Sequence, residues 1–293
     1  MNCFSYPVCV YWRNIVHHIP GVRMREYLDL VHRVLEHGVR KKNRTGVDTI
    51  SCFAEHYTVD LSAGFPLLTT KRVNFKSMLH EVLWYLSGED HIRNLQKHTK
   101  IWDAWADENG NLDTAYGRYW RRFPSARWDP AAGSYGVVEV DQIARVLELL
   151  KTDPMSRRMV VTAWEPGNAF DSKLPPCHFT FVFNVQGARL SCHLTQRSGD
   201  IALGIPFNLA AYSLLTGILA REAGLQVGQF SHTIVDAHIY VNHVDGLRLQ
   251  LQRTPRPLPR LEIAQKPLNE LGFDDFAVIG YDPYDPIKFE VAV

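Results

Sequence analysis

Two short runs of alternating apolar residues, joined by a turn, restrict the fold of this chain more than any other stretch. Every second residue is apolar on either side of Gln186-Gly187: Phe179, Phe181, Phe183 and Val185 before it, and Leu190, Cys192 and Leu194 after it. Alternation with a period of two is typical of strands that bury one face. The pattern predicts a β-hairpin, and its fold-back would bring Cys177, just before the first strand, close to Arg197, just after the second.

Other segments show helical or strand-like spacing without a strict strand–helix–strand rhythm. Helices are predicted over residues 24–38, 75–87, 143–153 and 209–219, and a further helix is predicted to start in the 236–243 stretch. Strands are predicted at 50–57, 159–164 and 230–235, and a surface loop at 123–135. This order predicts an α+β fold with a bent, mixed sheet.

Composition narrows the class of protein. The 293 residues carry a formal net charge of +1, which does not indicate a broad nucleic-acid surface. Five cysteines form no C-x-x-C pair, and no apolar run approaches the length of a membrane span. Residues 1–23 lack the features of a signal peptide and are interpreted as an N-terminal extension to a single domain over 24–293. We expect a cytoplasmic protein that requires neither a membrane nor a nucleic acid.

Several side chains could carry chemistry. Cys177 is a candidate nucleophile next to His178, although single cysteines are more often buried core residues. Four arginines and one serine could bind a phosphate through their guanidinium groups and hydroxyl, because guanidinium groups match phosphate geometry. Each arginine could instead be a solvated charge or a salt-bridge partner. These residues are Arg44, Arg157, Arg158, Arg197 and Ser198. No metal-binding motif, Walker motif or dinucleotide fingerprint is present.

Further candidates fit a nucleotide with a flat base. Asn208 offers a donor and an acceptor from one amide, which matches the edge of uracil, whereas a carboxylate would suit cytosine better. His238 and Tyr240 could reach the hydroxyls of a sugar, with core packing as the equal alternative. Glu81 lies among apolar helix positions and is either partly buried or at the helix edge. Trp102 and Trp105 are either core residues or a stacking wall.

The motifs of this chain, taken together, resemble those of the folate-dependent thymidylate synthase family. They run in family order from about residue 24 to 293: RTG at 44–46, FPLLTTKR, IWDAWADENG, LPPCH, QRSGD, GIPFN, DAHIYVNH, PRPLP and GYDP. The resemblance implies reductive methylation of dUMP to dTMP, with methylene-tetrahydrofolate as co-substrate and no metal. It also implies a three-layer fold, with a bent mixed sheet flanked by helices, and a homodimer packed sheet to sheet.

The resemblance assigns a role to each matching residue. Cys177 would add to carbon 6 of dUMP, Glu81 would organise proton transfers, and Asn208 would fix the uracil edge. His178 and Tyr116 complete the implied catalytic set. The implied substrate-binding set is Arg44, Arg197, Ser198, Gly199, Asp200, Asn208, His238 and Tyr240, with Arg157 and Arg158 supplied by the partner subunit. The implied folate-binding set is Asn74, Trp102, Trp105, Leu174, Asp200 and Ala292.

Two alternatives remain beside methylation. A pyrimidine hydroxymethylase of the same family would let water trap the intermediate, and a non-catalytic relative would only bind a nucleotide or RNA. Trp102 favours methylation because a bulky indole helps to exclude water. Positions that depart from the family pattern surround the implied site without removing any primary role: Asn74, Thr195, Gly199, Ile234 and Val235.

Overall fold

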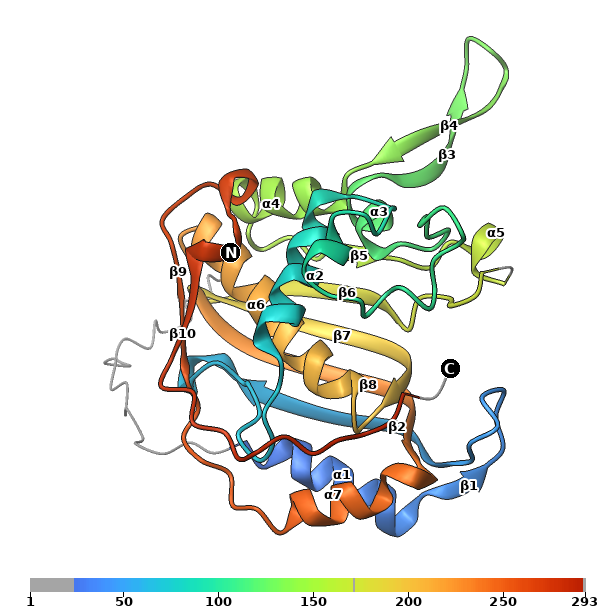
Figure 1. Cartoon of the computed structure of the whole chain (residues 1–293). Helices are drawn as coiled ribbons and strands as arrows, with labels where there is room; N and C mark the ends of the chain where they lie inside the picture. Colours follow the sequence, from blue (N-terminus) through green and yellow to red (C-terminus); the bar gives the residue numbers. More distant parts are fainter. Residues whose placement is uncertain (1–23, 171, 292–293) are drawn as a thin grey trace, which may run out of the picture.

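A six-stranded sheet forms the centre of the protein (Figure 1). The computed structural model describes residues 24–170 and 172–291. In spatial order the strands are β1 (Val39–Lys41), β2 (Thr49–Asp60), β8 (Gln226–Tyr240), β7 (Arg189–Asp200), β6 (His178–Gln186) and β5 (Val160–Thr162). Only β7 and β8 are parallel within this sheet, and the other neighbours are antiparallel. The predicted α+β fold with a mixed sheet is therefore confirmed.

Helices cover one face of this sheet. α6 (Gly204–Glu222) packs on β7 and β8, and α2 (Phe75–Ser87) packs on α6 (Figure 1). Thirteen of the 19 residues of α6 are buried, so this helix is a central element of the core. α1 (Glu26–His37) packs on β2 and on α7 (Val244–Leu251). The sheet and these helices share one hydrophobic core.

The remaining elements are shorter. The helices are α3 (Tyr116–Arg121), α4 (Gln142–Thr152) and α5 (Pro166–Ala169). The strands form two hairpin-like sheets, β3 (Phe123–Asp129) with β4 (Ser134–Val140), and β9 (Arg260–Ile263) with β10 (Phe276–Ile279). Single 3₁₀ turns are η1 (Leu61–Ala63), η2 (Leu95–Lys97), η3 (Val241–His243), η4 (Leu268–Glu270) and η5 (Phe273–Asp275).

The predicted helix boundaries have clear physical causes. α2 begins where the Asn74 side chain accepts a hydrogen bond from the Ser77 N–H, which satisfies one of the free donors of the first turn. It ends at Gly88, whose φ of 78° favours a residue without a Cβ. The predicted 179–194 hairpin is also confirmed, with the alternate apolar residues of β6 and β7 buried.

Three local predictions were wrong. Residues 123–135 contain β3 and the start of β4 instead of a loop, and the exposed rings of Trp128 and Tyr135 pair across the two strands (centroids 5.3 Å apart). The hairpin projects from the body in Figure 1. The 236–240 stretch continues β8, because it is paired with β2 on one side and β7 on the other. The helix predicted over 209–219 begins earlier, because Gly204 and Pro206 form the first turn of α6, and Asn208 therefore lies within this helix.

Candidate active site

Cys177 lies at the point where the chain enters β6, directly beside Arg197 of β7. The Arg197 N–H donates to the Cys177 carbonyl (2.8 Å), and Nη2 of Arg197 is 3.4 Å from the Cys177 Sγ. Two further bonds, from Nε to Pro176 O (3.0 Å) and from Nη2 to Pro175 O (2.7 Å), fix the guanidinium. The predicted proximity of Cys177 and Arg197 is thus confirmed.

The environment of the thiol keeps it protonated in the free protein. Burial raises the pKa of Cys177, while the positive charges of Arg197 and Arg44 oppose this rise. The Cys177 N–H donates to the Tyr116 hydroxyl (2.7 Å), which holds the backbone of the nucleophile in place. The proton of the thiol must therefore leave as the sulfur forms a bond to a substrate.

His178 points away from the thiol into a buried aromatic layer. Its Nδ1 lies 2.7 Å from the Tyr212 hydroxyl, and its ring stacks on Tyr116 (centroids 3.6 Å apart). Burial lowers the pKa of His178 to about 3, so the imidazole is neutral at physiological pH. His178 therefore contributes no positive charge to Cys177, although it packs against the tyrosine that bonds the Cys177 backbone.

Glu81 lies on the face of α2 that turns toward this aromatic layer. Trp102 donates from Nε1 to the Glu81 carboxylate (2.6 Å). Burial raises the pKa of Glu81 to about 7, in spite of the opposing hydrogen bonds from Trp102 and Tyr85. A carboxyl group with this pKa can exchange a proton near neutral pH. The Trp102 ring contacts Tyr116 (centroids 5.9 Å apart), so Glu81 and Cys177 belong to one continuous cluster.

Of the predicted arginines, Arg197 contacts Cys177, and the positive charge of Arg44 lowers the pKa of the thiol. Arg44 extends from the loop before β2, and its guanidinium lies 5.8 Å from the Trp105 ring centroid. Arg157 and Arg158 are exposed and precede β5. Met159, which follows Arg158, accepts a bond at its carbonyl from the Phe183 N–H (2.9 Å), and Phe183 is six residues along the chain from Cys177. At ~3.3 Å per residue this separation is about 20 Å, so the two arginines lie away from the Cys177 of their own chain.

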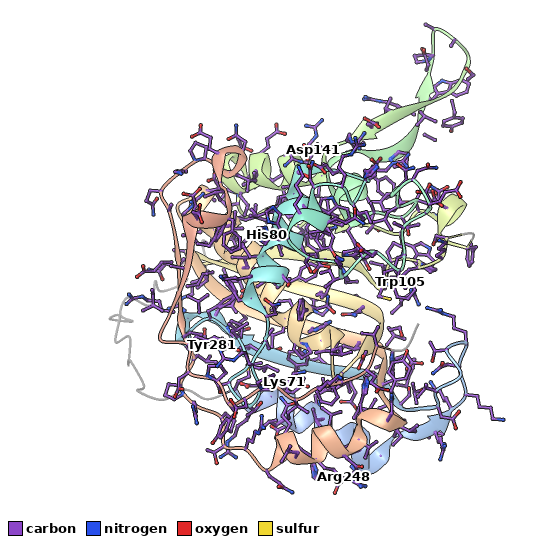
Figure 2. All side chains as sticks on the ribbon, viewed as in Figure 1. Lys71, His80, Trp105, Asp141, Arg248 and Tyr281 are labelled. Atoms are coloured by element: carbon purple, nitrogen blue, oxygen red, sulfur yellow. The ribbon has the colours of Figure 1, made fainter. Side chains whose placement is uncertain are left out.

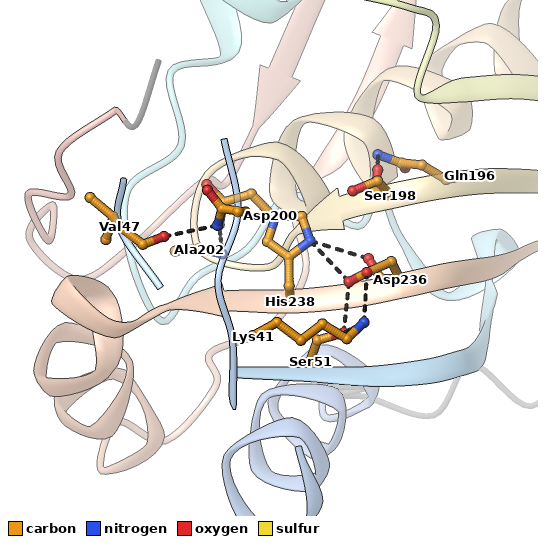
Figure 3. A network of polar contacts seen from close by, with 10 residues as sticks. Lys41, Val47, Ser51, Gln196, Ser198, Asp200, Ala202, Asp236 and His238 are labelled. Carbon is orange, nitrogen blue, oxygen red and sulfur yellow. Dashed lines mark hydrogen bonds and ion pairs between the residues drawn. The ribbon is translucent and has the colours of Figure 1, made fainter. Parts of the chain in front are cut away.

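The ends of β7 and β8 bring the other polar candidates together. Their parallel pairing places Ser198 beside Asp236 and Asp200 beside His238. The His238 Nδ1 lies 3.2 Å from the Asp236 carbonyl and 3.5 Å from its carboxylate (Figure 3). Tyr240 follows at the end of β8. Its pKa is raised by burial and, to a lesser extent, by the charge of Asp200.

Asp236 is a central residue of this site that the sequence analysis did not single out. Its carboxylate accepts hydrogen bonds from Ser51 Oγ (2.7 Å) and Lys41 Nζ (2.9 Å) (Figure 3). The bond to His238, together with these two, holds its pKa far below the ordinary value, so Asp236 stays ionised. The DAHIY motif contained the signal, because His238 needs a fixed acceptor two residues away on the same face of the strand.

Gly199 has no room for a side chain because Ile205 and Ile234 pack against it. A Cβ at Gly199 would lie 2.6 Å from Ile205 Cδ1 and 3.0 Å from Ile234 Cγ2, so no side chain fits there as these isoleucines stand. Gly199 lies on β7 opposite Ala237 of β8, and Ile234 lies three residues earlier on β8, opposite Gln196. The two departures from the family pattern therefore fill one volume.

Asn208 lies in the second turn of α6 and is partly exposed. Among the hydrogen bonds of residues 24–170 and 172–291, none engages its side-chain amide. The donor and the acceptor predicted to contact a base are therefore available to a ligand. Asp200 is more constrained, because its Oδ1 accepts the Ala202 N–H (2.8 Å).

The predicted folate-binding residues fall into two groups. A cavity of about 40 Å³ is lined by Trp102, Trp105 and Leu174, together with Leu112 and Thr114. Trp105 lies at the edge of the molecule in Figure 2, whereas Trp102 is only 9% exposed. Asn74 is exposed and already caps α2. Ala292 lies outside the described residues.

The comparisons agree with this geometry. The family model described as thymidylate synthase matches residues 25–293. A thymidylate synthase from Haloferax volcanii is 47% identical over 339 aligned residues, which cover 93% of this chain and 98% of that protein. This chain belongs to the thymidylate synthase family.

Membership of the thymidylate synthase family makes the chain a methyltransferase that uses methylene-tetrahydrofolate as co-substrate. Both comparisons carry that one name and do not favour the hydroxymethylase alternative. Within residues 24–170 and 172–291, no helix has both the length and the hydrophobicity to cross a bilayer. In the same part of the chain, no group of three or more His, Cys, Asp or Glu side chains is arranged to hold a metal ion.

Proposed function

We propose that Cys177 is the nucleophile with which this thymidylate synthase family member methylates dUMP. We also propose that Glu81 donates and accepts the protons that the reaction requires. The observation that carries the proposal is the single cluster of Cys177, Arg197, Tyr116, Trp102 and Glu81. It combines a positioned thiol, a cation 3.4 Å from the sulfur and a carboxyl group with a pKa of about 7. These are the groups that covalent activation of a pyrimidine ring requires.

The thiol adds to carbon 6 of the uracil ring, which gives carbon 5 the electron density it needs to act as a nucleophile. Because Cys177 is protonated before substrate binds, its proton passes to water in the open site as the carbon–sulfur bond forms, and the electron pair of the ring double bond moves to carbon 5. Glu81 exchanges protons with the ring through ordered water, and Trp102 holds its carboxylate. When bound, the folate supplies the one-carbon unit and the hydride. The aromatic cluster around Glu81 keeps bulk water away from the reacting ring.

Binding of the nucleotide is divided between its phosphate, sugar and base. Arg44, Arg197 and Ser198 bind the phosphate, because guanidinium groups match its geometry. His238 and Tyr240 bind the sugar, and the Asp236 carboxylate orients His238. Gly199 permits the close packing behind Ser198, and Asp200 lies where the nucleotide and folate sites meet.

We propose that the folate binds in the second half of the site, against the flat surfaces of Trp102 and Trp105. The cavity between these rings and Leu174 holds about 40 Å³, so it must widen to admit a fused-ring ligand. Asn74 and the C-terminal Ala292 complete the folate set as proposed from the family resemblance. Tyr116 and His178 position Cys177 through the bond to its backbone and the stacking of their rings.

We further propose a homodimer packed sheet to sheet, with helices as the outer layers and one domain over residues 24–293. Arg157 and Arg158 support this proposal, because they cannot reach the thiol of their own chain and are free to serve a neighbour's phosphate. The reduced thiol that the reaction needs suits a cytoplasmic location. Residues 1–23, which lie outside the described part, are an extension to the domain in this proposal.

Product analysis tests the proposed function directly. The protein is incubated with dUMP and methylene-tetrahydrofolate, and the nucleotide product is identified by mass spectrometry while ultraviolet absorbance follows dihydrofolate. We expect dTMP and one dihydrofolate for each nucleotide converted. A hydroxymethyl product without any absorbance change would replace methylation by hydroxymethylation, and no product would support a binding protein.

The first substitution to test is Asn208→Asp, which we expect to shift preference from dUMP toward dCMP. A carboxylate leaves the uracil edge with a mismatched hydrogen bond, and a buried mismatch costs about 1–3 kcal/mol. This cost corresponds to a change of about 5- to 150-fold in the ratio of kcat/KM values for the two nucleotides. Asn168→Asp, at a polar position of α5 with no role in the proposal, is the matched control. Unchanged selectivity in Asn208→Asp would show that Asn208 does not read the base.

The second substitution to test is Trp102→Gly, which we expect to divert part of the product to hydroxymethyl-dUMP. Removal of the indole opens a path for water and also deletes the donor to Glu81. The ratio of dihydrofolate formed to nucleotide converted should fall below one, as measured by absorbance and mass spectrometry on the same sample. Trp102→Phe keeps the bulk without the N–H donor and separates the two effects. A ratio of one in Trp102→Gly would mean that another residue excludes water.

A further inference from the structure

His243 is a buried histidine between the end of β7 and the C-terminal tail. It occupies the last position of η3 and is only 1% exposed. Its Nε2 lies 2.7 Å from the Glu290 carbonyl, and its Nδ1 lies 3.8 Å from the Asp200 Oδ1. Within the described part of the chain, Nδ1 has no hydrogen-bond partner. The imidazole therefore faces a site carboxylate on one side and the tail backbone on the other.

The tail that His243 contacts is attached along its length. Tyr281 donates to the Leu68 carbonyl (2.9 Å), and the Tyr284 N–H donates to Thr69 O (2.8 Å). The Val73 N–H also donates to the Tyr281 hydroxyl (2.9 Å), so the tail crosses the 68–73 segment. Farther along, the Phe289 ring lies 5.1 Å from the His243 ring. His243 is thus the contact that ties the last part of the tail to the site.

Gly246 of α7 shows how closely the tail approaches. A Cβ at this position would lie 2.6 Å from Phe289 Cε1 and 3.1 Å from Ile287 Cγ2. Lys71 reaches the other side, with Nζ 4.6 Å from the Phe289 ring centroid. The tail is therefore packed on both sides next to His243, and this geometry leaves little room for the imidazole to turn.

A neutral imidazole cannot satisfy both neighbours of His243. With its proton on Nε2 it donates to Glu290 O, but the Nδ1 lone pair then faces the Asp200 carboxylate. With its proton on Nδ1 it faces Asp200 correctly and loses the bond to the tail. Only the imidazolium presents an N–H to both neighbours, as a hydrogen-bond donor to Glu290 O and as a positive charge 3.8 Å from the Asp200 carboxylate.

The charges that face His243 decide which form is present. Burial lowers its pKa and the charge of Lys71 does the same, but Asp200 and the Glu290 carbonyl outweigh them, and the pKa of His243 is raised. Tyr240 packs edge-on against the ring (centroids 5.5 Å apart). Asp200 is thus the only one of these side chains that favours the imidazolium.

We propose that His243 is a proton-dependent latch, a positioning residue that ties Asp200 to the C-terminal tail at Glu290. The latch rests on the proposed function only in that Asp200 contacts the ligands there. A raised pKa means that the latched state binds the proton more tightly than the released state. The latch is therefore complete below the pKa that His243 has when released, and it weakens as the pH rises through the raised value.

Hydrogen exchange of the full-length protein tests the latch without any substrate. The protection factors of amides in 281–291, corrected for intrinsic rates, are compared between pH 5.5 and 8.5 for the wild type and His243→Gln. We expect protection to fall with pH in the wild type, by about tenfold for each unit by which the pKa of His243 differs between the two states. Glutamine can bond Glu290 O but does not titrate, so its protection should be independent of pH.

Two controls separate the latch from a structural role and from the proposed function. His37→Gln changes an exposed histidine at the end of α1 and should leave the pH dependence intact. Asp200→Asn should lower the pKa of His243, measured by NMR titration of its ring. A fall of protection with pH in His243→Gln as steep as in the wild type would overturn the latch. An unshifted His243 pKa in Asp200→Asn would overturn it as well. Neither measurement depends on turnover. A protein without activity would therefore contradict the proposed function and would not contradict the latch.

Discussion

Cys177→Ser will abolish turnover while dUMP binds within a few-fold of wild-type affinity. A serine hydroxyl is far less acidic and less nucleophilic than a thiol, so carbon–sulfur addition has no adequate replacement. Arg197 is held by the Pro175 and Pro176 carbonyls, and these bonds do not involve the sulfur. The phosphate clamp therefore survives the substitution. We expect kcat to fall by at least about 10³-fold.

The measurement combines absorbance assays with calorimetric titration of dUMP. Cys52→Ser is the matched control, because Cys52 is a partly exposed thiol on β2 outside the proposed cluster. It should retain wild-type kcat. Substantial activity in Cys177→Ser would assign the nucleophile to another residue, and loss of dUMP binding would mean that the thiol shapes the phosphate clamp.

Mixing two inactive variants will restore about a quarter of the wild-type activity. One is Cys177→Ala, and the other is the double variant Arg157→Ala with Arg158→Ala. In a symmetric dimer that exchanges subunits at random, half of the dimers are hybrids, and each hybrid has one complete site out of two. Phe183, which bonds Met159 beside these arginines, is about 20 Å from Cys177 along the extended chain, and this separation is the structural reason to expect sharing.

Activity is measured after mild denaturation and refolding of the mixture, and mass spectrometry of the intact dimers verifies exchange. Cys177→Ala mixed with Cys177→Ser is the control, because both variants lack the same group and no hybrid has a complete site. Exchange without recovered activity would show that each site is built from one chain. A monomer at assay concentration would remove the dimer from the proposal altogether.

Local periodicity was sufficient for the elements that bury one clear face. The β6–β7 hairpin and α2 follow from apolar spacing and from Gly88, which ends the helix. The strand that became β8 was predicted to end at Val235, because Asp236, His238 and Tyr240 are polar. Their positions in the strand come from pairing with two neighbours, which no local pattern reveals. The β3–β4 hairpin was missed because its glycines and small residues read as a loop.

The site was predictable in its residue types but not in its electrostatics. The hairpin fold-back places Cys177 next to Arg197, and most other roles came from the family resemblance. His178 looked like a positive neighbour for the thiol, yet burial lowers its pKa to about 3. Burial also raises the pKa of Glu81 to about 7. Both shifts depend on residues distant in sequence, and sequence spacing carries no measure of desolvation.

Because Gly199 and Ile234 share one volume, substitutions at these two positions are expected to occur together. A larger residue at 199 has room only if Ile205 moves and the side chain at 234 shrinks, and a glycine at 234 alone leaves a cavity in the core behind Ser198. Each single change passes through a less stable protein, so the residues behave epistatically. Lineages of this enzyme family are then expected to carry one matched pair or the other, and chimaeras that join β7 from one lineage to β8 from another inherit a mismatch.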